Sequence, residues 1–125
     1  MARTKVLIVD DEKEFASTLA ERLQIRYYEA AAVYSAEEAF TSIRSDPPDV
    51  VLMDLKMPGV SGIEALKIIK GSHPTIEIII LSGLGSKKSA SEGILTGAFD
   101  YVIKPVEIDD LVIKIDQAKN KKDNV

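Results

Sequence analysis

Hydrophobic and polar positions alternate along this chain with two different periods. Short, nearly unbroken apolar runs are followed by longer segments in which apolar residues recur every three or four positions. An unbroken apolar run is typical of a strand buried on both faces, and the longer spacing is typical of an amphipathic helix. The pattern predicts five strands, each followed by a helix. The predicted strands lie at residues 6–9, 27–34, 50–53, 76–81 and 99–103.

Strands that alternate with helices predict a parallel sheet covered by helices on both faces. Because crossovers between parallel strands are right-handed, few strand orders are available to five such units. We expect an α/β protein with a flavodoxin-like (βα)5 fold, a doubly wound five-stranded parallel sheet in the order 2-1-3-4-5. The second strand is alanine-rich and weakly hydrophobic, which suits the edge position that this order gives it.

Polar residues predict where several helices begin and end. Asp11 with Glu14, and Ser35 with Glu38, have the spacing of capping boxes at the starts of the first and second helices. Gly71 is predicted to end the third helix, because glycine readily takes the left-handed conformation that terminates helices.

The 125 residues are predicted to form one domain, with a core over about residues 4–119 and a polar, fraying tail over 120–125. The composition is 46% hydrophobic and 29% charged, which is typical of a globular protein. The net charge of −4 gives no general attraction to nucleic acid. The apolar runs are too short for a membrane span, and the sequence contains neither cysteine nor a secretion signal. We therefore expect a cytoplasmic protein that binds neither membranes nor, directly, nucleic acid.

Polar side chains follow the predicted strands, with Asp10 and Asp11 after the first and Asp54 after the third. Ser82 and Lys104 follow the fourth and fifth. In the expected topology these strand ends meet at one edge of the sheet, where such folds bind ligands. Three neighbouring carboxylates repel one another and favour a hard divalent cation, Mg²⁺ or Mn²⁺. A cation, a lysine and a hydroxyl beside a carboxylate nucleophile form a phosphoryl-transfer site.

Each of these residues also has an ordinary structural interpretation. Taken alone, Asp10 and Asp11 could cap the first helix, and Asp54 could begin a turn. A lone lysine such as Lys104 is most often a solvated surface residue, and Ser82 could be a turn residue at a strand end. Their occurrence together at strand ends favours the functional interpretation.

Three stretches of the sequence resemble the response-regulator receiver domains of two-component signalling. They are Val-Leu-Ile-Val-Asp-Asp-Glu at 6–12, Asp-Leu-Lys-Met-Pro-Gly-Val-Ser-Gly at 54–62 and Asp-Tyr-Val-Ile-Lys-Pro at 100–105. They occur in the order found in that family, and the resemblance extends over about residues 4–119. Such a domain accepts a phosphoryl group on an aspartate and changes its surface in response.

The resemblance implies a role for each matching residue. Asp54 corresponds to the aspartate that is phosphorylated, and Asp10 and Asp11 to the acid pair that holds Mg²⁺ or Mn²⁺. Asp54 and the backbone carbonyl of Lys56 would be further metal ligands. Lys104 corresponds to the lysine that pairs with the phosphoryl group.

The resemblance also implies a conformational switch. Ser82 corresponds to the hydroxyl residue that moves toward the phosphate, and Tyr101 to the aromatic residue that rotates inward behind it. Gly83 matches the small residue that keeps the site accessible, and the bond before Pro105 is expected to be cis. Leu84 is expected to slow hydrolysis of the acyl phosphate. Serine at position 82 and glycine at position 83 replace the commoner threonine and alanine, so we expect a less sharply two-state switch.

Partners are implied in the same way. A sensor histidine kinase or a histidine phosphotransfer protein would donate the phosphoryl group. The fourth helix, fifth strand and fifth helix would then present an altered surface to a downstream protein or a covalently attached output domain, and a phosphorylation-dependent dimer is compatible with this scheme. The chain would catalyse only its own phosphorylation and dephosphorylation, so we do not expect an enzyme that acts on external substrates. The sequence leaves open whether the native protein is a single domain.

Two other functions are considered at this stage. The first is an interaction module that keeps the receiver fold without phosphorylation; the complete set of strand-end residues argues against it. The second is a phosphohydrolase resembling the haloacid dehalogenases, which carry an Asp-x-Asp pattern after the first strand. Here the candidate nucleophile, Asp54, follows the third strand, and position 56 is lysine.

Overall fold

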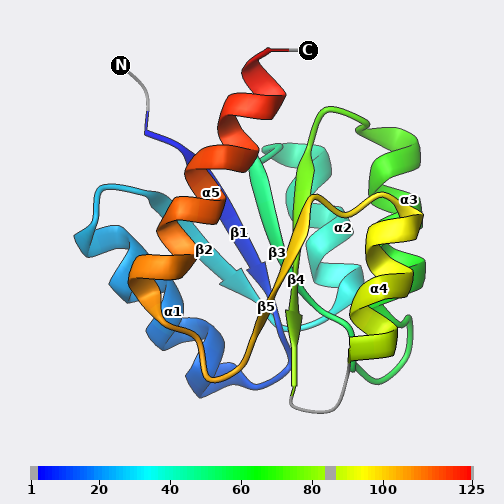
Figure 1. Ribbon diagram of the computed structural model, residues 1–125. Coiled ribbons are helices and arrows are strands. Elements are labelled where there is room, and N and C mark those ends of the chain that lie inside the picture. Colours follow the sequence, from blue (N-terminus) through cyan, green and yellow to red (C-terminus); the bar gives the residue numbers. More distant parts are fainter. Residues whose placement is uncertain (1–2, 84–86, 125) are drawn as a thin grey trace.

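The computed structural model describes residues 3–83 and 87–124. Five parallel strands form one sheet in the order β2-β1-β3-β4-β5, and a helix follows each strand (Figure 1). The predicted fold class and strand order are therefore confirmed. The strands are β1 (Lys5–Val9), β2 (Glu29–Val33), β3 (Val50–Asp54), β4 (Glu77–Ser82) and β5 (Asp100–Ile103). The helices are α1 (Lys13–Ile25), α2 (Ala36–Ser45), α3 (Gly62–Ser72), α4 (Lys87–Thr96) and α5 (Ile108–Asp123).

Helices cover both faces of the sheet (Figure 1). α1 and α5 pack on one face, where their apolar side chains meet residues such as Ile8 and Leu52. α2 and α3 pack on the other face together with α4, over residues such as Val9 and Met53. Because successive side chains of a strand point to opposite faces, strands covered on both sides are apolar throughout. None of the described helices is long and apolar enough to cross a lipid bilayer.

The central strands lie deepest in the molecule. Every residue of β3 and β4 is buried, whereas the edge strand β2 is partly exposed, as its alanine-rich sequence predicted. The parallel register brings the carboxyl ends of β1, β3, β4 and β5 to one edge of the sheet, at the bottom of Figure 1.

Strand β2 is shorter than predicted because the two tyrosines before it end helix α1. Tyr27 has a φ of 70°, in the left-handed region. The backbone N–H groups of Tyr27 and Tyr28 donate to the carbonyls of Gln24 and Leu23, each at 3.1 Å. These two bonds form a Schellman motif, which satisfies carbonyls in the last turn of a helix. The prediction extended the strand into this turn because aromatic residues favour strands.

The predicted capping box of Asp11 and Glu14 is wrong. The residue that caps α1 is Glu12, and its side chain makes no capping hydrogen bond. Instead the Oδ1 atom of Asp10 accepts a hydrogen bond of 3.0 Å from the Glu12 backbone N–H. At the second helix the predicted N-cap is present, since the Ser35 hydroxyl accepts a hydrogen bond of 3.1 Å from the Glu38 backbone N–H. The Glu38 carboxylate accepts from the Ser35 hydroxyl at 3.2 Å.

Helix α3 passes the residue that was predicted to end it. Gly71 lies within the helix, which continues to Ser72, and Gly71 is not among the glycines with positive φ. The last turn is closed by the N–H of His73, which donates to the Ile69 carbonyl at 2.7 Å. An added Cβ at Gly71 would have no neighbour within 4 Å, so the site is open to solvent and the glycine is tolerated there.

Helix α5 also continues further than predicted. The tail that was expected to fray from residue 120 onward is helical as far as Asp123. Lys119 pairs with Asp123 one turn later at 2.7 Å, and Lys122 pairs with Asp49 before β3 at 3.2 Å. These ion pairs attach the polar end of the helix to itself and to the sheet, which explains why a polar sequence remains helical.

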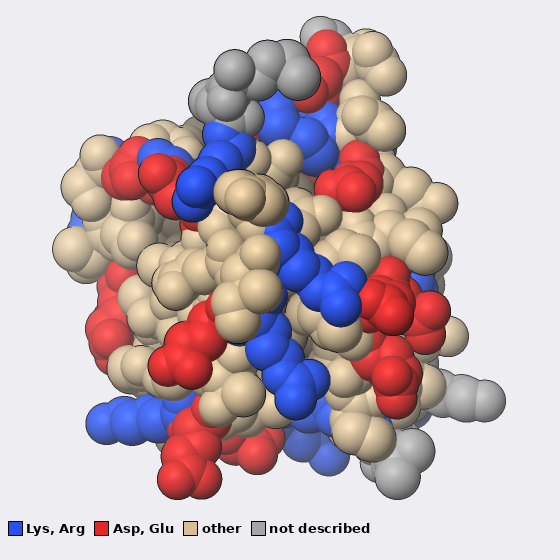
Figure 2. Space-filling view, turned by 90° about the vertical axis from the view of Figure 1, so that its left-hand side faces the viewer, with Lys and Arg blue, Asp and Glu red and all other residues tan. Residues whose placement is uncertain are grey.

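The side of the molecule that carries α1 has charges of both signs. Figure 2 shows Lys and Arg side chains in a band down this face, with Asp and Glu side chains on both sides of it. Arg26 at the end of α1 pairs with Asp109 at the start of α5 at 2.6 Å. The Tyr28 hydroxyl donates to the carboxylate of Asp116 at 2.7 Å. These contacts join the two helices that cover this face.

Candidate functional site

The carboxyl ends of the strands bring together several of the predicted site residues. Asp54 is the last residue of β3 and lies opposite Leu81 in the register with β4. Ser82 is the last residue of β4, and its carbonyl accepts a 2.7 Å hydrogen bond from the backbone N–H of Lys104. Asp10 follows β1, and its backbone N–H donates a 3.2 Å hydrogen bond to the carbonyl of Val33 at the end of β2. The sheet itself therefore positions these four side chains at one edge.

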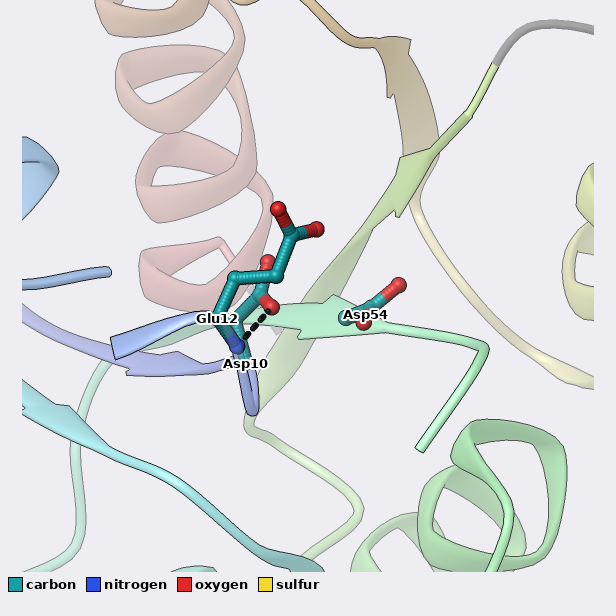
Figure 3. A group of neighbouring side chains, drawn as sticks. All are labelled: Asp10, Glu12 and Asp54. Atoms are coloured by element: carbon teal, nitrogen blue, oxygen red, sulfur yellow. Dashed lines mark hydrogen bonds between the residues drawn. The ribbon is translucent and has the colours of Figure 1, made fainter. Parts of the chain in front are cut away.

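Three acids meet at this edge (Figure 3). Asp10 is fully buried and Asp54 is 6% exposed. Each of Asp10, Glu12 and Asp54 has a carboxylate oxygen within 4.8 Å of the corresponding oxygens of the other two. Among the described residues, Asp11 does not belong to this group, and it is exposed. Glu12 is therefore the third acid of this group.

The environment of Asp54 favours its neutral form. Burial raises its pKa from 3.8 to about 6, and the negative charge of Asp10 adds to this effect. The positive charge of Lys104 and the hydrogen bond from the Lys56 backbone N–H, at 3.3 Å, act in the opposite direction. A carboxylate that is costly to ionise, and that lies beside two further acids, is a good ligand for a cation and a reactive nucleophile once it is ionised.

Lys104 is the positive charge of the site. Its Nζ atom lies 2.8 Å from Asp10 and 2.9 Å from Glu12. It also lies 4.5 Å from the centroid of the Phe15 ring, over the ring face. Burial lowers the pKa of the ammonium, but the bonds to Asp10 and Glu12 outweigh burial, so that the pKa is raised. The bond between Lys104 and Pro105 is cis, as expected.

The predicted switch residues lie on the two neighbouring strands β4 and β5. Ser82 is 3% exposed, and its hydroxyl donates to the carbonyl of Gly83 at 3.3 Å. Tyr101 is half-buried, packs against the core on the α3 side of the sheet, and lies with its ring 5.6 Å from the Nζ of Lys114. Leu84, which was predicted to affect hydrolysis, lies outside the described residues.

The loop after β3 is fixed by a close backbone contact. The first residue of α3, Gly62, donates its N–H to the Leu55 carbonyl at 3.2 Å. A Cβ built at Gly62 would lie 2.5 Å from both the Asp54 carbonyl oxygen and the Leu55 Cα. Only glycine allows this approach, because both neighbours are backbone atoms. The loop between them carries the exposed Lys56 past the Asp54 carboxylate.

The donor set fits a hard divalent cation. The group consists of carboxylate oxygens alone, which are the ligands that Mg²⁺ and Mn²⁺ prefer. A bound cation would also offset the negative charge of Asp10, which adds to the effect of burial in raising the pKa of Asp54. The residues that could hold such an ion are therefore Asp54 and Asp10, with Glu12 or Asp11 beside them.

A cavity of about 650 Å³ opens beside Lys104. It lies between the first turns of α1 and the segment that follows β5. Its lining is mainly apolar and includes Phe15, Leu19, Pro105 and Val106.

Two residues of the site were not predicted from the sequence. Glu12 was part of a matched stretch but was given no role, and Phe15 was placed only on the apolar face of the first helix. The signal for Glu12 was weak, because an acid at a helix start has an ordinary role with the helix dipole. Nothing in the sequence indicates that an aromatic ring on the core-facing side of α1 would contact the ammonium of Lys104.

Comparison with known proteins agrees with this geometry. A family model described as the response regulator receiver domain matches residues 6–116. The transcriptional regulatory protein ZraR of Salmonella typhimurium is 35% identical over 113 residues, which are 90% of this chain and 26% of ZraR. The regulatory protein AtoC of Escherichia coli is 33% identical over 117 residues, 94% of this chain and 25% of AtoC. The chain thus spans about a quarter of the length of these relatives.

Solved structures lead to the same conclusion. A response regulator receiver domain protein from Clostridium thermocellum superposes with a TM-score of 0.91 at 35% identity, covering 96% of this chain and 97% of that one. The chain belongs to the response-regulator receiver domain family. It has the fold and the strand-end acids of a two-component signalling domain.

Proposed function

We propose that the chain accepts a phosphoryl group on Asp54 and relays a signal through the resulting change in its surface. The observation that carries this proposal is the buried Asp54 carboxylate at the end of β3, with its raised pKa, next to two acids and Lys104. An isolated buried acid would destabilise the fold without compensation. The burial of Asp54 is explained if its carboxylate binds a cation and then accepts a phosphoryl group.

The reaction is an in-line transfer from a phosphohistidine. An oxygen of the Asp54 carboxylate attacks phosphorus and forms an O–P bond, while the N–P bond of the donor breaks. The donor imidazole keeps the electron pair of that bond and takes up a proton. The product is an acyl phosphate, whose phosphoryl group carries about −1.5 to −2 charges at neutral pH in place of the single negative charge of the carboxylate.

A bound Mg²⁺ or Mn²⁺ would supply positive charge to the attacking carboxylate and to the phosphoryl oxygens. Asp10, Asp11, Asp54 and the backbone carbonyl of Lys56 are the proposed ligands, and Asp10 and Asp54 lie close together in the structure. Lys104 is proposed to pair with a phosphoryl oxygen. The hydrogen bonds to Asp10 and Glu12 that raise the pKa of Lys104 keep it positively charged, which supports this role.

Ser82 and Tyr101 are proposed to transmit the change. The Ser82 hydroxyl would exchange its 3.3 Å contact with the Gly83 carbonyl for a phosphoryl oxygen. Tyr101 would turn inward behind it, and the surface of α4, β5 and α5 would change. Gly83, for which an added Cβ would meet nothing within 4 Å, leaves room for this movement. The phosphoryl group would shift an existing equilibrium between two surfaces.

The proposed donor is a sensor histidine kinase or a histidine phosphotransfer protein. The apolar cavity beside Lys104 adjoins the acids, so a docked donor could present its histidine to Asp54. The proposed recipient is a downstream protein or an attached output domain, because the curated relatives are about four times longer than the chain and are named as regulators. A phosphorylation-dependent dimer is part of the same proposal.

The remaining proposals concern the whole chain. Residues 1–125 are proposed to act as one receiver domain with its core over about 4–119, in the cytoplasm. The chain would catalyse only its own phosphorylation and dephosphorylation. We propose no action on an external substrate.

Measurement of the intact mass after incubation with acetyl phosphate and Mg²⁺ tests the phosphorylation. We expect the wild-type chain to gain the mass of one phosphoryl group, and Asp54→Asn to gain none. Asp46→Asn is a matched control, because Asp46 pairs with Lys5 at the opposite edge of the sheet, and it should behave like the wild type. An adduct that persists in Asp54→Asn, or none in the wild type, would refute the proposal.

A further inference from the structure

Three groups hold the ammonium of Lys104 in this structure. The carboxylates of Asp10 and Glu12 lie 2.8 and 2.9 Å from Nζ, and the Phe15 ring lies 4.5 Å from it. Asp10 follows the central strand β1, but the other two belong to the start of α1. The charge of Lys104 is therefore drawn toward the α1 side of the site, whereas the acid to be phosphorylated stands on β3.

The contact with Glu12 is the most easily broken of the three. The Glu12 side chain is 66% exposed, whereas that of Asp10 is fully buried. Glu12 is nevertheless fixed in direction, because its backbone N–H donates to Oδ1 of Asp10 at 3.0 Å. Figure 3 shows its side chain next to that of Asp10, and carboxylate oxygens of Asp10, Glu12 and Asp54 lie within 4.8 Å of one another. The backbone of Glu12 is held in place, whereas its exposed side chain can change conformation. Such a residue can make a contact in one state of the protein and release it in another.

The contact competes with the phosphoryl group for the same cation. A lysine ammonium has three N–H donors, and two of them already point to carboxylates here. If Lys104 moves away from the start of α1 toward a phosphoryl oxygen on Asp54, the distance from its Nζ atom to Glu12 increases. A contact of Lys104 that exists only in the unphosphorylated state stabilises that state. Its free energy is therefore subtracted from the free energy that Lys104 gains when it binds the phosphoryl group.

We propose that Glu12 is a positioning residue that holds Lys104 in the unphosphorylated state and so limits the stability of the phosphorylated one. This inference rests on the proposed function of Asp54. In this scheme the Glu12 carboxylate pairs with Lys104 and is not a ligand of the metal ion. The Glu12 carboxylate is largely exposed, so water already stabilises its charge and it gains less from a metal ion than buried Asp10 or Asp54.

The test compares Glu12→Gln with Glu14→Gln. Glu14 is an exposed acid of the first turn of α1, so the control removes the same charge near the same helix. The probe is beryllium fluoride, which occupies the place of the phosphoryl group without a covalent step, titrated at saturating Mg²⁺. We expect Glu12→Gln to bind it about two- to five-fold more tightly than the wild type, as expected for loss of an exposed ion pair. Glu14→Gln should match the wild type.

A second measurement follows the lysine directly. The ¹⁵N resonance of the Lys104 ammonium should shift in Glu12→Gln without probe, and it should not shift in Glu14→Gln. A merely structural role for Glu12 would not move this signal selectively. High salt should also reduce the difference in affinity between the wild type and Glu12→Gln, because the pair is exposed.

The outcomes separate the inference from the proposed function. If the wild type binds no beryllium fluoride and takes no phosphoryl group, the proposed function fails. If it does both, and Glu12→Gln binds the probe with unchanged affinity, the inference fails alone. Weaker binding of both Mg²⁺ and the probe by Glu12→Gln would also overturn it, because Glu12 would then be a metal ligand.

Discussion

Asp54 owes its chemistry to two conditions that occur together at one residue. It is buried at the end of β3, and it faces Asp10. Burial removes the water that would stabilise its charge, and the neighbouring acid makes the charge less favourable still. The site therefore gains stability whenever positive charge reaches Asp54. Both Lys104 and a divalent cation can provide that charge.

This electrostatic strain predicts how stability depends on pH in metal-free buffer. The native carboxyl of Asp54 has a pKa of about 6 against 3.8 in the unfolded chain. Between these values the native state binds more protons than the unfolded state, so the free energy of unfolding falls as pH rises through this window. Asp54→Asn removes the cost and should be more stable at pH 7 by about 1–3 kcal/mol.

Urea unfolding at a series of pH values, with EDTA present, measures this effect. The advantage of Asp54→Asn should be largest above pH 6 and should disappear near pH 3.5, where both side chains are neutral. Asp11→Asn is the control, because Asp11 is exposed, and it should change stability much less. An Asp54→Asn variant that is no more stable than the wild type at pH 7 would contradict the account.

Most of the individual site residues could be predicted from the sequence. Asp10, Asp54, Ser82 and Lys104 each follow a run of buried apolar residues, so the alternating pattern alone places them at one edge. The partner of Lys104 could not be predicted in this way. Its contact with Glu12 depends on how the first turn of α1 is oriented, and the sequence pattern does not determine that orientation.

At the scale of elements, the approach of α3 to β3 fixes the loop that carries the reactive carboxylate. Gly62 lies so close to the end of β3 that any side chain would overlap backbone atoms of Asp54 and Leu55. The backbone N–H of Lys56 then reaches the Asp54 carboxylate at 3.3 Å. The position of the loop beside Asp54 thus depends on the glycine at position 62.

We expect Gly62→Ala to lower the free energy of unfolding by about 1–3 kcal/mol, the usual cost of forcing extra atoms into a packed site. Because the displaced backbone belongs to Asp54, phosphorylation by acetyl phosphate should slow as well. Gly71→Ala is the matched control in the same helix, since its added Cβ meets nothing within 4 Å. Urea unfolding and the rate of acyl-phosphate formation provide the two measurements. Equal stability of Gly62→Ala and the wild type would be evidence against this close contact.

The hydrophobic pattern predicted the positions of the strands and helices, but it did not predict the residues at which some of them begin or end. The five strands and five helices occur where apolar periodicity placed them. The start of β2 differed because Tyr27 takes a left-handed conformation, which a strand-forming aromatic residue rarely adopts. The end of α3 differed because Gly71 continues the helix. Both ends are decided by a few backbone hydrogen bonds that residue type alone does not specify.

Across the whole molecule, the two edges of the sheet use charge differently. The carboxyl edge collects acids around one lysine. At the amino edge, the acids are matched by several lysines. There Glu77 is 4% exposed, and its carboxylate lies 3.1 Å from Lys70 of α3 and 3.2 Å from Lys121 of α5. These pairs connect helices from opposite faces of the sheet and serve the fold.

Of the two lysines that pair with Glu77, Lys70 makes the additional hydrogen bonds to the backbone. Its ammonium donates to the carbonyls of Pro74 and Ile76, each at 2.9 Å, as well as to Glu77. Lys70→Met leaves a buried acid with only one exposed partner and should cost about 1–3 kcal/mol of stability at pH 7. Adding Glu77→Gln to that variant should restore part of the loss, since the unpaired charge is then removed.

Thermal or urea unfolding of the single and double variants measures this coupling. Lys67→Met is the control, because Lys67 is an exposed residue of the same helix, and it should have little effect. If Lys70→Met and Lys67→Met are equally stable, Lys70 does not compensate the buried acid.

At this scale the sequence predicted the topology well. Alternation of strands and helices, together with right-handed crossovers, left few arrangements, and the observed strand order was among them. The pairing of Glu77 with lysines from two helices was not predicted. It joins residues far apart in the chain, and an acid at the start of an apolar strand has no pattern of its own.

The central claim is that Asp54 carries the phosphoryl group. Treatment of the phosphorylated protein with sodium borohydride, followed by peptide mass mapping, tests it most directly, because an aspartyl phosphate is reduced to homoserine at the modified position. The account predicts homoserine at position 54, formed only after incubation with acetyl phosphate and Mg²⁺. Reduction at another position, or a stable phosphate on a hydroxyl residue, would contradict it.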